Sequence, residues 1–192
     1  MATATANQLL KTIQRAKEEG WENLDLSNQK LTELPAEIGQ LTCLKWLDLS
    51  RNKLSKLPTE IGQLTNLTEL DLRFNQLHEL PAAIAKLTNL TILDIGYNQL
   101  NQIPTEIGEL TSLTELSLDN NQLVELNSQV GALKNLVWLA LENNNLKSLP
   151  PELGTINSLV RLIVDDNLQN LTPELQDLAS RCRQPSAFNE LP

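Results

Sequence analysis

Residue types that carry out reactions in proteins are sparse in this chain. It has one histidine, His78, and only two cysteines, Cys43 and Cys182. A zinc site needs several such ligands close together, and a catalytic nucleophile needs an adjacent base and an orienting acid. No Gly-Lys pair of the kind used by a phosphate-binding loop occurs in the sequence. We therefore expect no metal, no cofactor and no enzymatic activity.

Carboxylates and aromatic rings, in contrast, recur at a fixed spacing. Four aspartates follow one another at intervals of 23 residues: Asp25, Asp48, Asp71 and Asp94. Trp46 and Trp138 occupy the same place within this interval, four intervals apart. On an open surface such groups attract cations and anchor protein partners. The spacing favours recognition over catalysis.

The interval of 23 residues belongs to a repeat that spans most of the chain. With position 1 at Trp21, leucine returns at position 1 of the six later copies, leucine or a related side chain at positions 4 and 6 of all seven, and asparagine at position 9 of six. One copy cannot enclose so many apolar side chains, whereas stacked copies enclose them in one continuous core. The repeat predicts an α/β solenoid with a concave parallel sheet, an irregular or 3-10 convex side, and helical caps at both ends.

Two positions of the repeat are assigned structural duties. The asparagine at position 9 is expected to be buried and to bond backbone groups where the chain bends after the strand. Glycine at position 19, as in Gly39 and Gly62, is expected to relieve backbone strain before the chain returns to the next strand.

A solenoid needs caps because its terminal core layers would otherwise face water. The first cap is expected over 1–20, with a helix over 5–19 that starts at a capping box, Thr5 and Gln8. Its apolar face would hold Leu9, Leu10, Ile13 and Ala16; a membrane-surface helix is the alternative. The chain, 1–192, is interpreted as a single domain: the cap, seven repeats over 21–181, a second cap helix over 172–183, and a tail over 184–192.

Charge and composition restrict the partners and the compartment. Lysine and arginine number 15 against 24 acidic residues, a net charge of −9, which disfavours binding to nucleic acid. No apolar run approaches the ~20 residues of a membrane span, and the N-terminus lacks the apolar segment of a signal peptide. Stacking would hold the two cysteines far apart, so both are expected to remain reduced. We expect a monomeric, cytoplasmic protein without a membrane or nucleic-acid partner.

The candidate binding site follows from strand alternation, because positions 3 and 5 face away from the core and positions 7 and 8 lie directly after the strand. The stacked aspartates are expected to repel one another, which raises some of their pKa values and favours a cationic partner. The alternative is that aspartate is simply the usual residue at this position of the repeat, copied by duplication. Most aromatic residues of the chain also fall on these positions. The residues expected to bind a partner are Trp46, Asp48, Glu69, Asp71, Arg73, Phe74, Ile92, Asp94, Tyr97 and Trp138.

The sequence pattern of the repeat resembles that of a known class of repeats. The pattern Leu-x-x-Leu-x-Leu-x-x-Asn-x-Leu-x-x-Leu-Pro-x-x-Ile-Gly-x-Leu-Thr-Asn, from Leu44 to Asn66, is similar to the Ras-group leucine-rich repeats of plant intracellular proteins, Scribble-like scaffolds and Roco-family GTPases. The opening from Leu9 to Trp21 resembles bacterial and Roco-type N-termini. The resemblance covers about residues 9 to 183 and implies a fold rather than a ligand. The Roc and COR domains are absent, so it does not imply GTPase activity.

Three functions are compatible with these features. We expect a non-catalytic module that binds a protein or peptide on the concave face, and the acidic row suits a partner with basic residues. The second hypothesis is a regulatory repeat segment of a larger enzyme such as a Roco-type GTPase. The third is a host-directed effector or surface recognition protein, which would need export without a visible signal.

Overall fold

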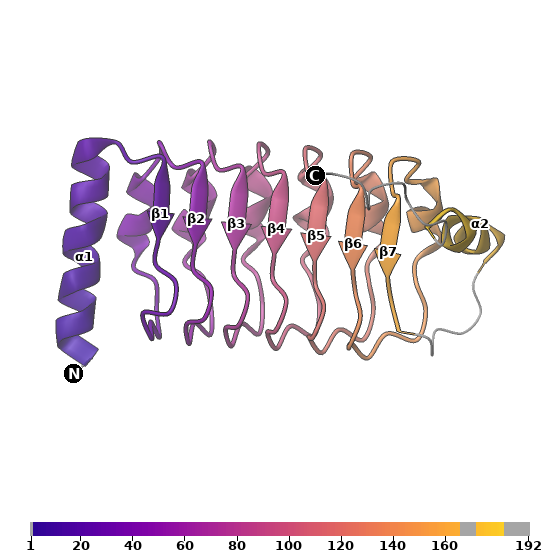
Figure 1. The fold of residues 1–192 in the computed structure, drawn as a ribbon, viewed down its shortest axis with the longest axis horizontal. Coiled ribbons are helices and arrows are strands. Elements are labelled where there is room, and N and C mark those ends of the chain that lie inside the picture. Colours follow the sequence, from indigo (N-terminus) through magenta and orange to yellow (C-terminus); the bar gives the residue numbers. More distant parts are fainter. Residues whose placement is uncertain (1, 166–171, 183–192) are drawn as a thin grey trace, which may run out of the picture.

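A computed structural model describes residues 2–165 and 172–182 of the chain. Seven strands of three residues each form one parallel sheet in sequence order, with each strand paired to the next (Figure 1). The strands are β1 (Asn23–Asp25), β2 (Trp46–Asp48), β3 (Glu69–Asp71), β4 (Ile92–Asp94), β5 (Glu115–Ser117), β6 (Trp138–Ala140) and β7 (Arg161–Ile163). The expected leucine-rich repeat solenoid and its strand positions are confirmed.

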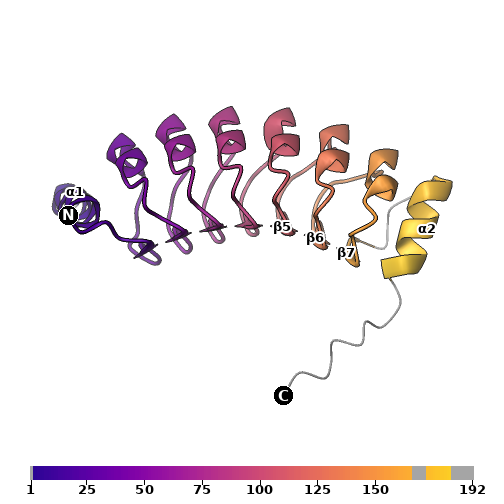
Figure 2. The same cartoon turned by 90° about the horizontal axis from the view of Figure 1, so that it is seen from above.

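Six short 3-10 helices form the opposite side of the stack. Figure 2 shows them as the outer row of the arc, with the strands along the inner row, so that the sheet is concave. Proline precedes five of the six; its φ is −68° at Pro58, and extended backbone there leads into the turn. The helices are η1 (Ala36–Gln40), η2 (Thr59–Gln63), η3 (Ala82–Lys86), η4 (Thr105–Glu109), η5 (Ser128–Ala132) and η6 (Pro151–Thr155).

The core lies between the two rows and runs without interruption along the stack. Leu47, Leu93 and Leu116 of the strands are 0% exposed, as are Ile61 and Ile107 of the 3-10 helices. Strand register places equivalent leucines beside one another, so each repeat covers the apolar side chains of its neighbour. The core therefore depends on stacking, as the repeat predicts.

The asparagines at position 9 form the expected buried column. Asn98 Nδ2 donates to the Leu72 and Ile95 carbonyl oxygens, each at 3.0 Å. Its Oδ1 accepts the Leu77 N–H at 3.0 Å. Asn52, Asn75, Asn121 and Asn144 make equivalent contacts, so each amide joins two neighbouring repeats.

The expected role of glycine at position 19 is wrong. Among the glycines that the structure describes, only Gly20 has a positive φ, at 63°. A Cβ added to Gly39 would lie 2.7 Å from the Glu60 carbonyl oxygen, and one added to Gly108 would lie 2.7 Å from that of Gln129. Glycine is therefore needed because successive 3-10 helices pack closely, and not because the backbone is strained.

Helices α1 (Ala2–Glu19) and α2 (Pro173–Cys182) lie at the two ends of the stack (Figure 1). Leu9, Ile13 and Ala16 of α1 are buried against the first repeat. Gly20 ends α1: its N–H bonds the Lys17 carbonyl and the Trp21 N–H bonds the Ala16 carbonyl, which is the Schellman pattern. In α2, Leu175 and Leu178 are buried.

Two details of the expected first cap are wrong. Because α1 begins at Ala2, Thr5 lies inside the helix and cannot be its N-cap. Leu10 is 39% exposed, because it lies beside the apolar face rather than on it. The tail over 184–192 lies outside the described residues. Neither described helix is long and apolar enough to cross a membrane.

Candidate functional site

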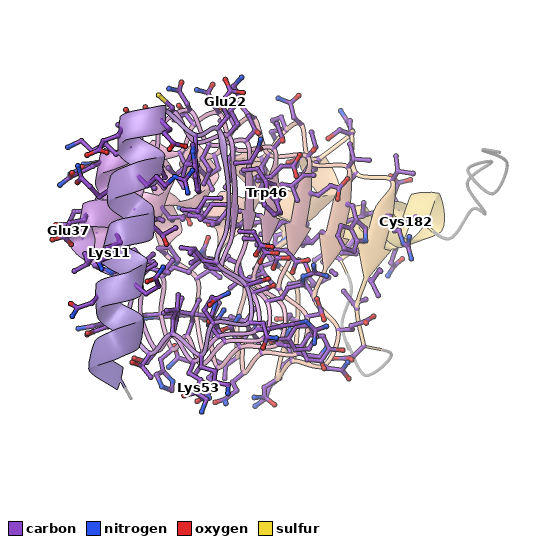
Figure 3. All side chains as sticks on the ribbon, turned by 60° about the vertical axis from the view of Figure 1, so that its left-hand side comes forward. Lys11, Glu22, Glu37, Trp46, Lys53 and Cys182 are labelled. Carbon is purple, nitrogen blue, oxygen red and sulfur yellow. The ribbon has the colours of Figure 1, made fainter. Side chains whose placement is uncertain are left out.

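A hollow of about 290 Å³ lies on the concave face across β2, β3 and β4. Seven of the ten residues expected from the sequence to bind a partner line it, and Leu70 is the one addition. Figure 3 shows Trp46 on the strand side of the solenoid and Glu37 on the 3-10 side. The lining residues are Trp46, Asp48, Glu69, Leu70, Asp71, Arg73, Ile92 and Asp94.

Strand register brings these side chains together. Trp46, Glu69 and Ile92 are direct neighbours at position 3, and Asp48, Asp71 and Asp94 are direct neighbours at position 5. Adjacent strands lie ~4.8 Å apart, so two rows of outward side chains form across three repeats. The first row is largely apolar around one carboxylate, and the second is wholly acidic.

The aspartates at position 5 have a structural duty that sequence reasoning missed. Oδ1 of Asp48 accepts the N–H of Ser50 at 2.7 Å, and Oδ1 of Asp71 accepts that of Arg73 at 2.9 Å. In the same way, the carboxylates of Asp25 and Asp94 accept the N–H groups of Ser27 and Gly96. The recurrence of aspartate is therefore explained in part by the turn that follows each strand, because a carboxylate is a good acceptor for that N–H.

Arg73 neutralises part of the acidic row from within the chain. Its Nη2 lies 2.6 Å from Asp71 Oδ2, and its Nε lies 3.2 Å from Asp94 Oδ2. The hydrogen bond to Asp71 raises the pKa of the guanidinium above its ordinary value. Two of the four carboxylates in the hollow are thus already paired with a cation.

Burial raises the pKa of the Asp94 carboxyl, and the charge of Asp71 acts in the same direction. The Gly96 N–H and the Arg73 charge oppose this rise. A raised pKa among the stacked aspartates was expected from their mutual repulsion. At Asp94 the rise is present, but its main cause is desolvation.

Asp48 and Glu69 are the other two carboxylates, and neither forms an ion pair with any residue that the structure describes. Four carboxylates against one guanidinium give the hollow a net charge of −3 (1 − 4). Trp46 supplies an aromatic surface next to both unpaired groups. Carboxylates and an indole together attract a lysine or arginine side chain, through charge and through cation–π contact.

A stack of three side chains, Arg51, Phe74 and Tyr97, lies at position 8 of the same three repeats; we call it the edge stack. The Phe74 and Tyr97 rings are 4.3 Å apart between centroids and inclined by 23°. Cζ of Arg51 lies 4.8 Å from the Phe74 ring centroid. Arg51 was not among the residues expected to bind, because nothing in its spacing shows that it covers Phe74.

Position 8 also has an unusual backbone. Its φ is 57° at Arg51, 56° at Phe74 and 57° at Tyr97. The equivalent residues of repeats one, five and six have the same left-handed conformation, but all three are asparagine, at Asn28, Asn120 and Asn143. Asparagine tolerates this region, whereas other side chains incur about 1–3 kcal/mol each.

Trp138 lies outside the hollow, on β6. It is the direct neighbour of Glu115 on β5 and of Arg161 on β7. Its indole Nε1 is buried and has no hydrogen-bond partner among the described residues. The structure therefore places seven of the expected binding residues together, puts Phe74 and Tyr97 at the adjacent edge, and leaves Trp138 two strands away from the hollow.

The part of the chain that the structure describes holds no cluster of three or more histidine, cysteine or acidic side chains that could bind a metal ion. His78 lies on the loop after β3, where its backbone N–H donates to the Ser55 carbonyl oxygen. Cys43 is exposed, and Cys182 Sγ donates to the Leu159 carbonyl oxygen at 3.7 Å.

Comparison with known proteins supports the repeat and the fold. A model of a leucine-rich repeat region matches residues 37–122. No curated protein matches the chain. Among solved structures, the plant peptide hormone receptor RGFR1, in complex with RGF2, is 37% identical with a TM-score of 0.68, over 74% of this chain and 24% of the receptor.

Two further structures extend the likeness. The ectodomain of the Arabidopsis thaliana receptor kinase GASSHO1/SCHENGEN3, in complex with CASPARIAN STRIP INTEGRITY FACTOR 2, is 34% identical with a TM-score of 0.68, over 78% of this chain and 18% of that one. A leucine-rich repeat protein of Leptospira interrogans is 26% identical with a TM-score of 0.52, over 86% of this chain and 60% of its own. The chain thus spans less than two thirds of each. Its repeat, its fold and these likenesses show that the chain forms a leucine-rich repeat solenoid.

Proposed function

We propose that the chain is a non-catalytic interaction module that binds a protein or peptide on its concave face. The observation that carries the proposal is the hollow across β2, β3 and β4. It combines partly exposed aromatic and apolar surface from Trp46 and Ile92 with the carboxylates of Asp48 and Glu69, which form no ion pair with any described residue. Buried aromatic anchors supply most of the binding energy in protein interfaces, and charges supply specificity and association rate.

The comparisons support this class of function without fixing the partner. RGFR1 is a peptide hormone receptor, and both it and GASSHO1/SCHENGEN3 were solved in complex with another molecule. For this chain we propose a partner with basic residues, because the hollow is acidic. The excess of acidic residues also argues against nucleic acid as a partner.

Further proposals rest on the sequence. We assign the repeats to the 23-residue Ras-group class, on their resemblance to the N-terminal repeats of Roco-family GTPases and to plant intracellular Ras-group repeat proteins. We also propose that the protein is a cytoplasmic monomer. Fractionation of the native cells tests the compartment, and light scattering of the purified protein tests the oligomeric state.

The proposed function is tested by affinity capture from a lysate of the native cells, read out by quantitative mass spectrometry. The baits are the wild type, the double variant Trp46→Ala and Trp138→Ala, and Glu106→Ala on the convex side. We expect the double variant to lose partners that the wild type and Glu106→Ala retain, because truncation of an aromatic anchor costs about 2 kcal/mol or more. Partners lost with Glu106→Ala but kept by the double variant would place binding on the other face.

A further inference from the structure

The edge stack differs from the rest of position 8 in a way that the fold does not require. Repeats one, five and six hold asparagine there, which suits the left-handed backbone. Repeats two, three and four hold Arg51, Phe74 and Tyr97 in the same conformation, all three of them exposed. In three consecutive repeats, a residue with a strained backbone thus carries a large side chain that is exposed to solvent. Strained residues of this kind cluster at binding sites.

Arg51 is held in place while its hydrogen-bonding groups remain available. The guanidinium lies over the Phe74 ring, and that ring stacks on Tyr97. Within residues 2–165 and 172–182, the guanidinium forms no ion pair and no side-chain hydrogen bond. A guanidinium carries five N–H donors around its edge, and a cation–π contact with a ring does not use them as hydrogen bonds to oxygen acceptors. Arg51 is thus a cation that rests on an aromatic ring and whose donors have no acceptor among the described residues.

The edge stack adjoins the hollow. Arg73 lines the hollow and Phe74, the next residue, belongs to the stack; both features lie on repeats two to four. Their charges are opposite, since the hollow has a net charge of −3 and the stack carries a single unpaired cation. A partner that covers both therefore meets an acidic region and a basic one side by side.

We propose that the edge stack is a second part of the binding face, in which Arg51 receives an acidic side chain of the partner while a basic side chain of the same segment enters the hollow. This inference rests on the proposed function and specifies the partner as a peptide segment that carries both signs of charge. A planar guanidinium binds a carboxylate through two parallel hydrogen bonds. A dianionic group would be repelled more strongly by the acidic chain around it, which favours a carboxylate over a phosphate.

Immobilisation supports the assignment on energetic grounds. A free arginine loses side-chain freedom when it binds a carboxylate, and that loss reduces the affinity. Stacking on Phe74 has already restricted Arg51 before the partner arrives. The strained residues at position 8 therefore act as positioning residues for the guanidinium.

A random linear peptide library displayed on phage tests the inference. It is selected in parallel on the wild type, on Arg51→Gln and on Lys53→Gln, which removes the same charge from an exposed residue two positions away. We expect wild-type binders to share a basic residue and an acidic residue at a fixed spacing. Arg51→Gln should lose the preference for the acidic residue, keep the preference for the basic one, and bind the wild-type peptides about tenfold more weakly. Lys53→Gln should behave as the wild type.

Phe74→Asn separates binding from stability, because asparagine is the residue that the chain itself uses at this position in three other repeats. We expect its melting temperature to equal or exceed that of the wild type while its acidic preference is lost. A lower melting temperature with unchanged preference would show that the stack is only structural.

The remaining outcomes distinguish this inference from the proposed function. Binders that depend on Trp46 but show no acidic preference, or lose it equally with Lys53→Gln, would overturn the role of Arg51 and leave the concave site intact. If no peptide binds the wild type better than the Trp46→Ala and Trp138→Ala double variant, both the proposed function and this inference fail.

Discussion

Each buried asparagine of the column replaces backbone partners that the bend after the strand removes. Asn98 is 8% exposed and its amide serves backbone groups of two repeats. Asn98→Ala should therefore lower the free energy of unfolding by about 1–3 kcal/mol, because buried N–H and C=O groups lose their partners. Asn66→Ala is the matched control, since Asn66 makes one exposed bond to the Thr42 carbonyl. Urea denaturation of the two variants checks the difference; equal midpoints would contradict the role of the column.

Asp94 should make stability depend on pH in a defined direction. Because its pKa is raised in the folded state, folding favours its protonated form, and this contribution is lost as the pH rises through the raised pKa. Asp94→Asn keeps an oxygen to accept the Gly96 N–H and leaves Arg73 paired with Asp71. The variant should thus be at least as stable as the wild type at pH 7.

The difference in stability between Asp94→Asn and the wild type should shrink as the pH is lowered. Asp94 then becomes protonated, and the cost of burying its charge disappears from the wild type. Urea denaturation at pH 7 and at successively lower pH values measures the difference. A variant that is less stable at pH 7 and equal at low pH would mean that the ion pair with Arg73 outweighs the desolvation of Asp94.

Among the elements, α1 shows how a cap protects the end of the stack. Ile13 is 2% exposed on the inner face of the helix, whereas Leu10 is 39% exposed. Ile13→Ala should lower the free energy of unfolding by about 2–5 kcal/mol, and Leu10→Ala should change it by no more than about 0.5 kcal/mol. Thermal unfolding compares them directly. Similar losses in both variants would show that α1 packs differently.

The strands and the core were predictable because their positions recur in every copy. One apolar residue in a sequence can lie on the surface, but an apolar residue at the same position of seven repeats indicates a core position. Leu47 and its equivalents could therefore be assigned to the core from the sequence. The start of α1 and the exposure of Leu10 were not predictable in this way, since a cap occurs once and offers no register. Glycine at position 19 was located correctly and explained wrongly, because the close approach of two 3-10 helices is a property of the stack.

In the whole molecule, the charges of the hollow should control the rate at which a basic partner associates. Glu69 is the suitable residue to change, because it has neither an ion pair nor the backbone duty of the aspartates. Glu69→Gln should slow association with a peptide selected on the wild type and reduce its dependence on ionic strength, with a smaller effect on dissociation. Glu106→Gln on the convex side is the control. Stopped-flow kinetics at several salt concentrations checks this, and equal salt dependence in both variants would contradict it.

Alternation along the strands predicted which residues lie on the concave face, and seven of the ten named ones do meet in one hollow. The sequence did not show that Arg73 already pairs with Asp71 and Asp94, or that Arg51 covers Phe74. Both facts depend on side-chain directions between neighbouring repeats. Spacing alone therefore located the acidic row but overestimated how much of it is available to a partner.

The tight packing of the outer row has a consequence for shape. The distance between successive 3-10 helices, set by glycine at Gly39 and Gly108 and by the small Ala85, fixes how far the arc opens. A bulkier side chain at these positions would lengthen the row of 3-10 helices relative to the sheet. The solenoid would then bend more tightly, and its concave face would become narrower. Evolution can thus tune the width of a recognition surface through residues that no ligand touches, and a contact map of any complex would leave them out.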